Sequence, residues 1–300
     1  MTVLFALVGL GIACGQASVP LAAGAPGGTL RVAVVQIRSG PDLRANVAKI
    51  NARLAECAAR RAEIAVFPEC AVSSYAKEAI LALKPDALAA AEKEIAAACR
   101  AHGIATIVGV PQLRDGRWFN CALIIDRRGE VIGRYDKVHL AGQDLQWNCV
   151  GGTGLPPVFS IGGTRASVII CHDSRYPELC RLPVIAGARV VFYLSFEAAL
   201  VKESKMVPYR AQVQARAVEN NVFLVHANAP ADDLRTGSHG QSRIVGPDGN
   251  LLQEASQLQE EVLVADLDLK EATAKWALDS LNGPQAEWWR AALKDVPRLP

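Results

Sequence analysis

Short apolar runs rich in β-branched residues alternate along this chain with segments in which apolar residues recur every three or four positions. The first run, residues 30–37 (LRVAVVQI), has the length of a strand. Residues 42–61 follow it with apolar side chains at helical spacing. Further strands are predicted at residues 64–67, 104–110, 118–126, 131–135, 166–171, 189–194, 222–227, 242–245 and 262–267, and further helices at 86–102, 177–187, 208–220 and from about residue 270. Strands mixed with helices and hairpins, without a linker-like stretch, predict one layered α/β domain with sheets inside and helices outside.

The two ends of the chain differ from this pattern. No charged side chain precedes Arg31, and residues 3–14 form an apolar stretch of signal-peptide length, with Gly15 and Ala17 at suitable cleavage positions. A lipoprotein-type box ending at Cys14 is a weaker alternative, and a misassigned start or disordered leader is the third. We assign residues 1–28 to a signal peptide or disordered leader, 29–283 to the domain and 284–300 to a tail. The signal-peptide reading predicts an exported protein, periplasmic or secreted, and the lipoprotein reading predicts a lipid anchor at Cys14. The third reading predicts a cytoplasmic protein.

Composition excludes several classes of function. Lys and Arg number 32 against 30 Asp and Glu, and no basic run occurs, which argues against a nucleic-acid partner. Beyond the N-terminus no apolar run reaches the length that spans a bilayer. The eight cysteines have irregular spacing and no CxxC pair, so neither a zinc site nor a disulfide framework is indicated. We expect no metal and no organic cofactor.

Three reactive side chains each lie near the end of an apolar strand. Glu69 follows IAVFP, Lys137 lies in GRYDKVHL, and Cys171 ends SVIIC before HDSRYPE. Strand ends of α/β folds are where side chains converge on a crevice. Taken singly, each has a structural interpretation: a solvated strand end, a surface ion-pair partner and a buried inert thiol.

In combination, FPE, YxKxHL and ICxDxRxPE in this order closely resemble the signature segments of the nitrilase superfamily, the carbon–nitrogen hydrolases. Residues 33–36, 214–220 and 240–249 match as well, so the resemblance spans roughly residues 30–270. It implies a four-layer α-β-β-α sandwich and a triad carried over as Glu69, Lys137 and Cys171.

That resemblance implies covalent catalysis. Cys171 is the expected nucleophile, its pKa lowered by Lys137 and by the start of the following helix. Glu69 is the expected general base, and Lys137 with the backbone N–H of His172 would stabilise the oxyanion. Substrate-binding candidates are His172, Arg175, Asp144, Phe196 and Glu197. His172, Arg175 and Arg210 could bind a substrate carboxylate. The pocket could be lined by Phe196, Glu197 and Tyr209. Glu197 would instead suit a substrate that carries an amine.

The loop after Lys137 departs from the family pattern. Many active members have a second glutamate there, but residues 141–148 contain none. Asp144 with a shorter reach, or Gln146 with a neutral hydrogen bond, could hold the lysine in its place.

The leading prediction is therefore a cysteine-dependent amidohydrolase of small linear amides or N-carbamoyl compounds, releasing ammonia or an amine. A nitrilase acting on a small nitrile is one alternative, and a catalytically silent dimeric binding or scaffold protein of the same fold is another. The resemblance and the apolar Trp288 and Trp289 in the tail also predict a homodimer or a larger even oligomer.

Overall fold

A computed structural model describes residues 28–198, 206–232 and 237–300 of this 300-residue chain. The predicted leader, with Cys14, lies outside the described residues. The strands are β1 (Thr29–Gln36), β2 (Ile64–Val66), β3 (Ala105–Arg114), β4 (Arg117–Ile125), β5 (Val131–Asp136), β6 (Phe159–Ile161), β7 (Thr164–Ile170), β8 (Val190–Ser195), β9 (Phe223–Asn228), β10 (Arg243–Val245), β11 (Leu251–Glu254) and β12 (Glu261–Asp268). The helices are α1 (Leu43–Ala59), α2 (Lys77–Ala82), α3 (Pro85–His102), α4 (Gly142–Gln146), α5 (Pro177–Ile185), α6 (Met206–Val218), α7 (Lys275–Asp279) and α8 (Ala286–Ala292), with 3-10 turns η1 (Cys171–Arg175), η2 (Ser280–Asn282) and η3 (Leu293–Asp295).

The strands form two six-stranded mixed sheets, ordered β12-β1-β2-β3-β4-β5 and β11-β10-β9-β8-β7-β6. In each sheet the strands in the middle are parallel: β1, β2 and β3 in the first, and β7, β8 and β9 in the second. The segments after β2, β7 and β8 therefore leave from the carboxyl ends of parallel strands, which is where side chains converge in α/β folds.

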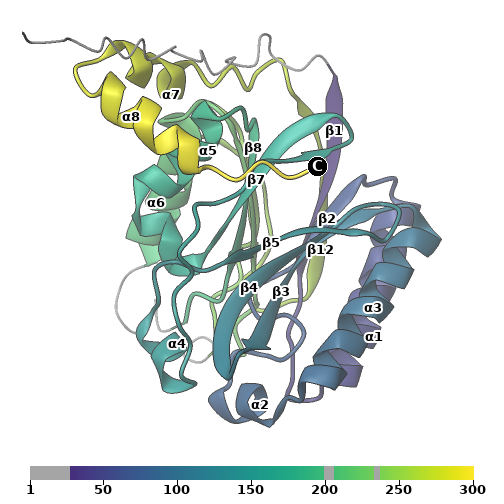
Figure 1. Ribbon diagram of the computed structural model, residues 1–300. Helices are drawn as coiled ribbons and strands as arrows, with labels where there is room; N and C mark the ends of the chain where they lie inside the picture. The colour runs from purple at the N-terminus through teal and green to yellow at the C-terminus, as the bar shows by residue number, and fades with distance from the viewer. Residues whose placement is uncertain (1–27, 199–205, 233–236) are drawn as a thin grey trace, which may run out of the picture.

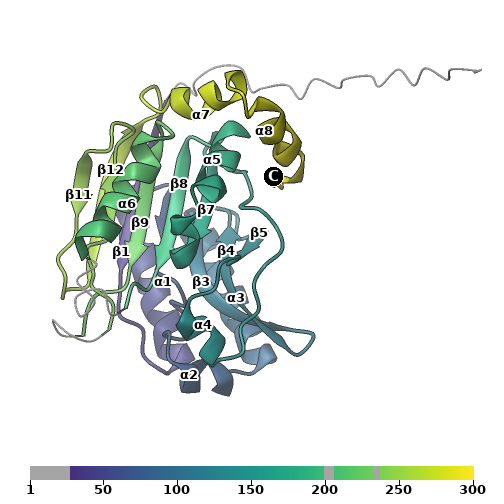
Figure 2. The same ribbon diagram turned by 90° about the vertical axis from the view of Figure 1, so that its left-hand side faces the viewer.

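The two sheets lie face to face, with α1 and α3 on the outside of the first and α5 and α6 on the outside of the second (Figures 1 and 2). One apolar cluster fills the space between the sheets, and one lies under the helices on each outer face. This is the predicted four-layer α-β-β-α sandwich, and that prediction is confirmed.

Strand β1 shows why the sequence folds this way. Val32 and Val34 point into the cluster between the sheets, whereas Ala33 and Val35 point under α1 and α3. Both faces of β1 are thus buried, which is why its sequence is continuously apolar rather than alternating. Helix α1 begins after Asp42, whose carboxylate accepts hydrogen bonds from the backbone N–H groups of Arg44 and Ala45.

The predicted strands and most helices agree with the structure to within a few residues. The helix expected from about residue 270 begins instead at Lys275, because Ala274 before it has a left-handed backbone, with φ of 54°. The sequence pattern does not predict β6, β11, α2, α4 or α8, all of which have seven residues or fewer.

Residues 284–300 fold back onto the domain. After α8 and η3 the chain runs beside β6, where the N–H of Leu299 donates to the carbonyl of Val158 at 2.7 Å. Trp289 packs against the apolar cluster under α5, whereas Trp288 stays 53% exposed.

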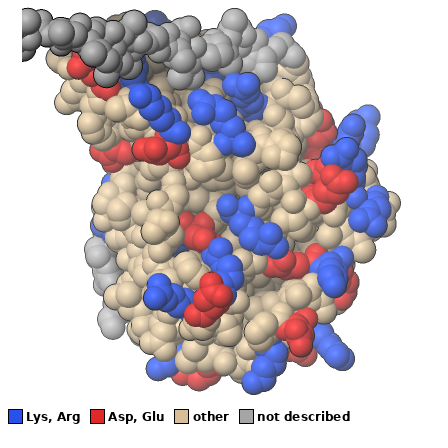
Figure 3. All heavy atoms as spheres, viewed as in Figure 1, with Lys and Arg blue, Asp and Glu red and all other residues tan. Residues whose placement is uncertain are grey.

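On the face shown in Figure 3, acidic and basic side chains are interspersed and form no large patch of one sign. No helix in the described part of the chain is long and apolar enough to cross a bilayer. Within the same residues, no group of three His, Cys, Asp or Glu side chains is placed to hold a metal ion, and the cysteines are free thiols.

Candidate active site

Glu69, Lys137 and Asp144 meet in one buried cluster. Glu69 follows the carboxyl end of β2, Lys137 follows β5, and Asp144 lies in α4. The Lys137 ammonium lies 2.7 Å from Glu69 Oε1 and 2.8 Å from Asp144 Oδ2, and all three side chains have no exposed surface. A lone buried ammonium would be very costly, so the two carboxylates are what keeps Lys137 charged.

Asp144 is the second carboxylate on Lys137, in the loop that lacks the glutamate found in many members of the family. Its Oδ2 accepts from Lys137 and from the N–H of Ala141 at 2.7 Å. Its Oδ1 accepts from Asn120 Nδ2 at 2.9 Å and from the Tyr75 hydroxyl. Gln146, the alternative, is exposed to solvent. The structure thus places Asp144, and not Gln146, on the lysine.

Among the described residues, two donors reach one carboxylate oxygen of Glu69 and one donor reaches the other. Oε1 accepts from Lys137 and from Asn120 Nδ2, each at 2.7 Å. Oε2 accepts from the backbone N–H of Phe196 at 2.8 Å. A carboxylate oxygen has two lone pairs, so Oε2 keeps one with which to take a proton.

A glycine in β3 allows Glu69 to lie where it does. A Cβ at Gly109 would come within 2.4 Å of Cys70 N and Pro68 O, and 2.7 Å of Glu69 Cα. The turn that carries Glu69 crosses directly over β3, and its Pro68 carbonyl accepts the Gly109 N–H at 3.2 Å. Only glycine permits that approach.

Cys171 lies at the carboxyl end of β7, where η1 begins. Its backbone is left-handed, with φ of 43°, a conformation that costs a non-glycine residue about 1–3 kcal/mol. The Asp173 carboxylate holds this turn by accepting from Tyr135 OH and from His139 N, each at 2.8 Å. On the other side, the Tyr193 hydroxyl lies 3.2 Å from the Cys171 carbonyl oxygen. The strain is thus maintained by contacts from several elements.

The electrostatics favour a resting thiol at Cys171. Burial raises the pKa of Cys171 well above its usual value, the charge of Glu69 adds to the shift, and Lys137 opposes it. The prediction of a lowered thiol pKa is therefore wrong for the resting site, because the carboxylates and desolvation outweigh the single ammonium.

The pKa values of the other three groups show how the charges are shared. Burial raises the pKa of Glu69, and Lys137 only partly counteracts this. Burial alone would raise the pKa of Asp144, but Lys137 and the hydrogen bonds hold it below its ordinary value. Burial alone would lower the pKa of Lys137, but Glu69 and the neighbouring acidic groups raise it well above normal. Asp144 is therefore the permanent counter-ion of Lys137, and Glu69 is the carboxylate more ready to accept a proton.

The remaining predicted site residues separate into two groups. His172 lies beside Tyr176, and burial, Arg175 and Lys137 lower the pKa of His172, which favours a neutral imidazole. Phe196 supports Glu69 through its N–H, and its ring stacks on Tyr75 at 5.3 Å between centroids.

The second group is engaged elsewhere. Arg175 is exposed and contacts Tyr209 of α6 through its guanidinium. Arg210 pairs with Glu254 at 3.0 Å. Glu197 is buried among protein groups, with Tyr193 OH and His239 Nε2 each 2.6 Å from one of its oxygens.

Sequence reasoning missed Asn120 and Tyr75. Asn120 bridges Glu69 and Asp144 through one amide nitrogen. The available signal was a polar residue in the otherwise apolar second half of β4, where burial requires a partner. Tyr75 gave no such signal, because its place over Lys137 depends on the path of a loop.

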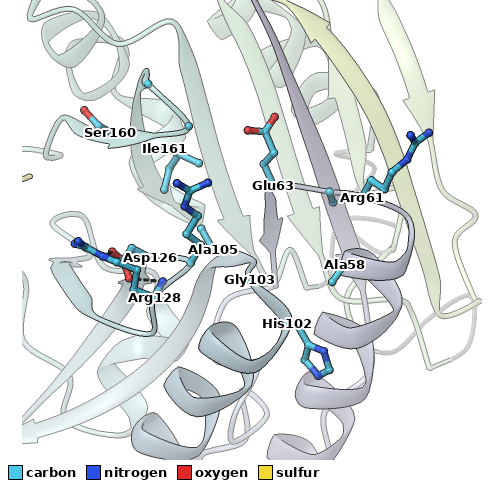
Figure 4. Close-up of a pocket in the computed structure, with 14 residues that line it drawn as sticks. Ala58, Arg61, Glu63, His102, Gly103, Ala105, Asp126, Arg128, Ser160 and Ile161 are labelled. Atoms are coloured by element: carbon cyan, nitrogen blue, oxygen red, sulfur yellow. Dashed lines mark hydrogen bonds and ion pairs between the residues drawn. The ribbon is translucent and has the colours of Figure 1, made fainter.

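Two surface cavities help to place the site. The one in Figure 4, of about 670 Å³, lies beside Glu63 before β2 and Ala105 at the start of β3, at the opposite strand ends from Glu69. Its Arg128 pairs with Asp126 at 2.9 Å. A smaller cavity of about 390 Å³ is bordered by Glu69, Tyr75 and Phe196. The second cavity is the one that adjoins the reactive cluster.

Comparison with known proteins decides the family. The carbon–nitrogen hydrolase family model matches residues 31–275. The chain belongs to the carbon–nitrogen hydrolase family. The predicted resemblance to the nitrilase superfamily is confirmed.

Individual relatives of this carbon–nitrogen hydrolase support the same assignment. The chain is 31% identical over 249 residues to the hydrolase in the pqqF 5' region of Pseudomonas protegens, covering 80% of this chain and 83% of that one. It is 32% identical over 164 residues to the hydrolase in the agr operon of Staphylococcus aureus, covering 54% of this chain and 61% of that one. The crystal structure of an amidase from Nesterenkonia sp. superposes with a TM-score of 0.76 and 28% identity, over 88% of this chain and 96% of that one.

Proposed function

We propose that this protein is a cysteine-dependent amidohydrolase that cleaves a small linear amide or N-carbamoyl compound through a thioester. The observation that carries the proposal is the buried cluster of Glu69, Lys137 and Asp144, whose charges shift the pKa of Cys171. Stability alone does not explain a buried ammonium between two carboxylates, because replacing a buried ion pair with apolar residues often leaves the stability of a protein unchanged.

Acylation begins from the resting thiol. The Cys171 sulfur attacks the substrate carbonyl carbon while its proton passes to Oε2 of Glu69. Lys137 has three N–H groups, of which two point at Glu69 and Asp144, so the third is available to the oxyanion. The N–H of His172 is the second proposed donor. The carbon–nitrogen bond then breaks, and Glu69 returns the proton to the leaving nitrogen, which departs as ammonia or an amine.

Deacylation reverses the proton path. Glu69 takes a proton from water, the hydroxide attacks the thioester carbonyl, and the carbon–sulfur bond breaks. The thiolate recovers the proton from Glu69, and the carboxylic acid product leaves. For an N-carbamoyl substrate the same steps give a carbamate in place of the acid.

Covalent chemistry at the corresponding site of a solved relative supports the proposal. Structures of Nesterenkonia amidase variants show Michael addition of acrylamide, and addition of the acetamide moiety of fluoroacetamide, at the active-site cysteine. The same two reagents are suitable probes of Cys171.

The test is a panel of about twenty amides, N-carbamoyl compounds and nitriles assayed for ammonia release, with fluoroacetamide labelling followed by peptide mass spectrometry. We expect turnover of an amide or carbamoyl compound and labelling at Cys171, with both lost in Cys171→Ala. Cys180→Ala, which removes a buried thiol under α6, is the matched control and should behave as wild type. Turnover confined to nitriles would favour a nitrilase. Wild-type ammonia release by Cys171→Ala, or labelling at Cys149 or Cys180, would reject the mechanism.

Two proposals concern the rest of the chain. We propose that the N-terminal segment is cleaved on export, because no charged side chain precedes Arg31 and the first strand in the described residues begins at Thr29. We also propose an even-numbered homo-oligomer, because Trp276 and Trp288 of the C-terminal helices are 52% and 53% exposed.

A further inference from the structure

A chain of hydrogen bonds runs from α6 through the nucleophile's turn to Glu197. Gln212 Nε2 donates to Ser174 Oγ at 2.8 Å, and Ser174 Oγ lies 3.1 Å from the Tyr193 hydroxyl. The Tyr193 hydroxyl lies 2.6 Å from Glu197 Oε1. The Tyr193 hydroxyl has a single hydrogen and two acceptors nearby, Glu197 Oε1 at 2.6 Å and the Cys171 carbonyl at 3.2 Å. The shorter contact is to a carboxylate, which is the stronger acceptor, so Tyr193 donates to Glu197 and Ser174 donates to Tyr193.

The carboxylate of Glu197 is fixed on its other oxygen as well. His239 Nε2 lies 2.6 Å from Oε2, and the Glu197 side chain is 1% exposed. Burial alone would raise the pKa of Glu197, but the hydrogen bond from His239 and the neighbouring charges lower it to about 2. Glu197 is therefore an ionised acceptor at the end of the chain. Since protein groups occupy both oxygens, it is not the open site for a substrate amine that its sequence position suggested.

This chain of hydrogen bonds supports the turn in which the backbone of Cys171 is strained. Ser174 belongs to the same short turn as Cys171, whose left-handed backbone persists only if its surroundings impose it. Asp173 fixes one side of this turn, and the hydrogen bond between Ser174 and Tyr193 fixes the other. We propose that Glu197 is a positioning residue for Cys171, because it ends the hydrogen-bond chain that holds Tyr193 and Ser174 against the nucleophile's backbone. This inference rests on the proposed function only in taking Cys171 as the nucleophile.

Glu197 also acts on Cys171 through its charge. Its carboxylate opposes formation of the thiolate, as Glu69 does and Lys137 does not. A substitution that only loosened the fold would not remove this charge, so its effect can be told apart from that of Glu197→Gln. The titratable and charged groups near Cys171 come from several elements: Glu69 after β2, Tyr75 in the next loop, Lys137 after β5, Asp144 of α4, and Tyr193 and Glu197 at the end of β8. On its own turn they are His172 and Asp173, whereas Arg175 of that turn contacts Tyr209.

The experiment measures the rate of Cys171 alkylation by iodoacetamide against pH, together with kcat and KM for the best substrate of the wild type. Glu197→Gln keeps an oxygen acceptor for Tyr193 but removes the charge, so the alkylation midpoint should shift to lower pH. Tyr193→Phe breaks the chain but keeps the charge, so the midpoint should stay while kcat falls about tenfold at unchanged KM. The control is Glu92→Gln on α3, where both oxygens are likewise engaged, by Gln112 and Arg134, each at 2.6 Å. It should change neither quantity.

An unshifted alkylation midpoint in Glu197→Gln, or a wild-type kcat in Tyr193→Phe, would overturn the inference. Thermal melting checks that each variant is folded. If Glu197→Gln does not fold, Tyr193→Phe, which removes a single oxygen atom, decides the question through kcat and KM. Alkylation requires no substrate. A wild type that turns over nothing, with a shifted midpoint in Glu197→Gln, would therefore reject the proposed function and retain the coupling of Glu197 to Cys171.

Discussion

Asp144→Asn removes one charge from the buried cluster while keeping the size of the side chain, and we expect it to be strongly destabilising. All four partners of Asp144 are donors: Lys137 Nζ and Ala141 N on Oδ2, and Tyr75 OH and Asn120 Nδ2 on Oδ1. An amide has one oxygen and one NH₂ group. In one orientation its NH₂ faces Lys137 Nζ and Ala141 N, and in the other it faces Asn120 Nδ2, while the Tyr75 hydroxyl can turn to accept. Each orientation therefore leaves at least one donor facing a donor.

The magnitude follows from the burial of the pair. Removing one partner of a buried ion pair costs about 3–5 kcal/mol, because the other charge is left without compensation. Lys137 keeps Glu69 at 2.7 Å, so we expect the lower end, about 3 kcal/mol at pH 7. The lysine is also the proposed oxyanion donor, and its displacement should lower kcat by about a hundredfold.

Urea unfolding followed by circular dichroism measures the stability, and ammonia release measures kcat. The matched control is Asp136→Asn, whose carboxylate pairs with Arg114 at 2.5 Å but is 21% exposed. Pairs near the surface contribute about 0–1 kcal/mol, so this variant should lose no more than that. If Asp144→Asn loses no more stability than Asp136→Asn, the buried cluster does not carry the energy assigned to it.

The difference between wild type and Asp144→Asn should also depend on pH in a definite direction. The folded pKa of Asp144 lies below its ordinary value. Its stabilising contribution is therefore complete above the unfolded value of about 3.9, and is lost as the pH falls through the folded pKa. The stability difference should be full at pH 7 and shrink in acid. A difference that grew in acid would refute this assignment of charge.

Three further predictions test other parts of the molecule. Gly109→Ala should lower both the melting temperature and kcat, because its Cβ would meet Cys70 N and Pro68 O at 2.4 Å; Gly154→Ala, where nothing lies within 4 Å, is the control, and equal behaviour of the two variants would contradict the argument. Trp288→Ala should weaken self-association in light scattering with little effect on melting, since Trp288 is 53% exposed; an unchanged mass would remove it from the interface. Intact-mass analysis from the native host should show a product lacking the first residues, and a product starting at Met1 would refute export.

Much of the fold could be predicted because its signals are local. Apolar runs such as those of β1 and β7 are buried on both faces, so their sequences are continuously apolar and separate clearly from the amphipathic α1. Elements with weak local signals were missed. Strand β6 has three residues and α4 has five, too few for a period to show.

The candidate site was partly predictable for the same reason. Glu69, Lys137 and Cys171 each lie at or near a strand end within a recognisable segment, and the strand ends indicated where they would lie. Asp144 remained one of two alternatives, because Gln146 lies on the same short loop and the choice depends on which side chain the loop turns inward.

The amino-acid sequence by itself determined the layered α/β architecture and the family, and it indicated Glu69, Lys137 and Cys171 as the candidate reactive residues, since all of these depend on the order of residues along the chain. Only the tertiary structure decided that Asp144 pairs with Lys137, that Asn120 bridges the two carboxylates, and that Glu197 is occupied by Tyr193 and His239. It also reversed the expected pKa shift of Cys171. The physical reason is that hydrogen-bond partners and desolvation depend on groups brought together from distant parts of the chain, and their distances and burial have no counterpart in sequence spacing.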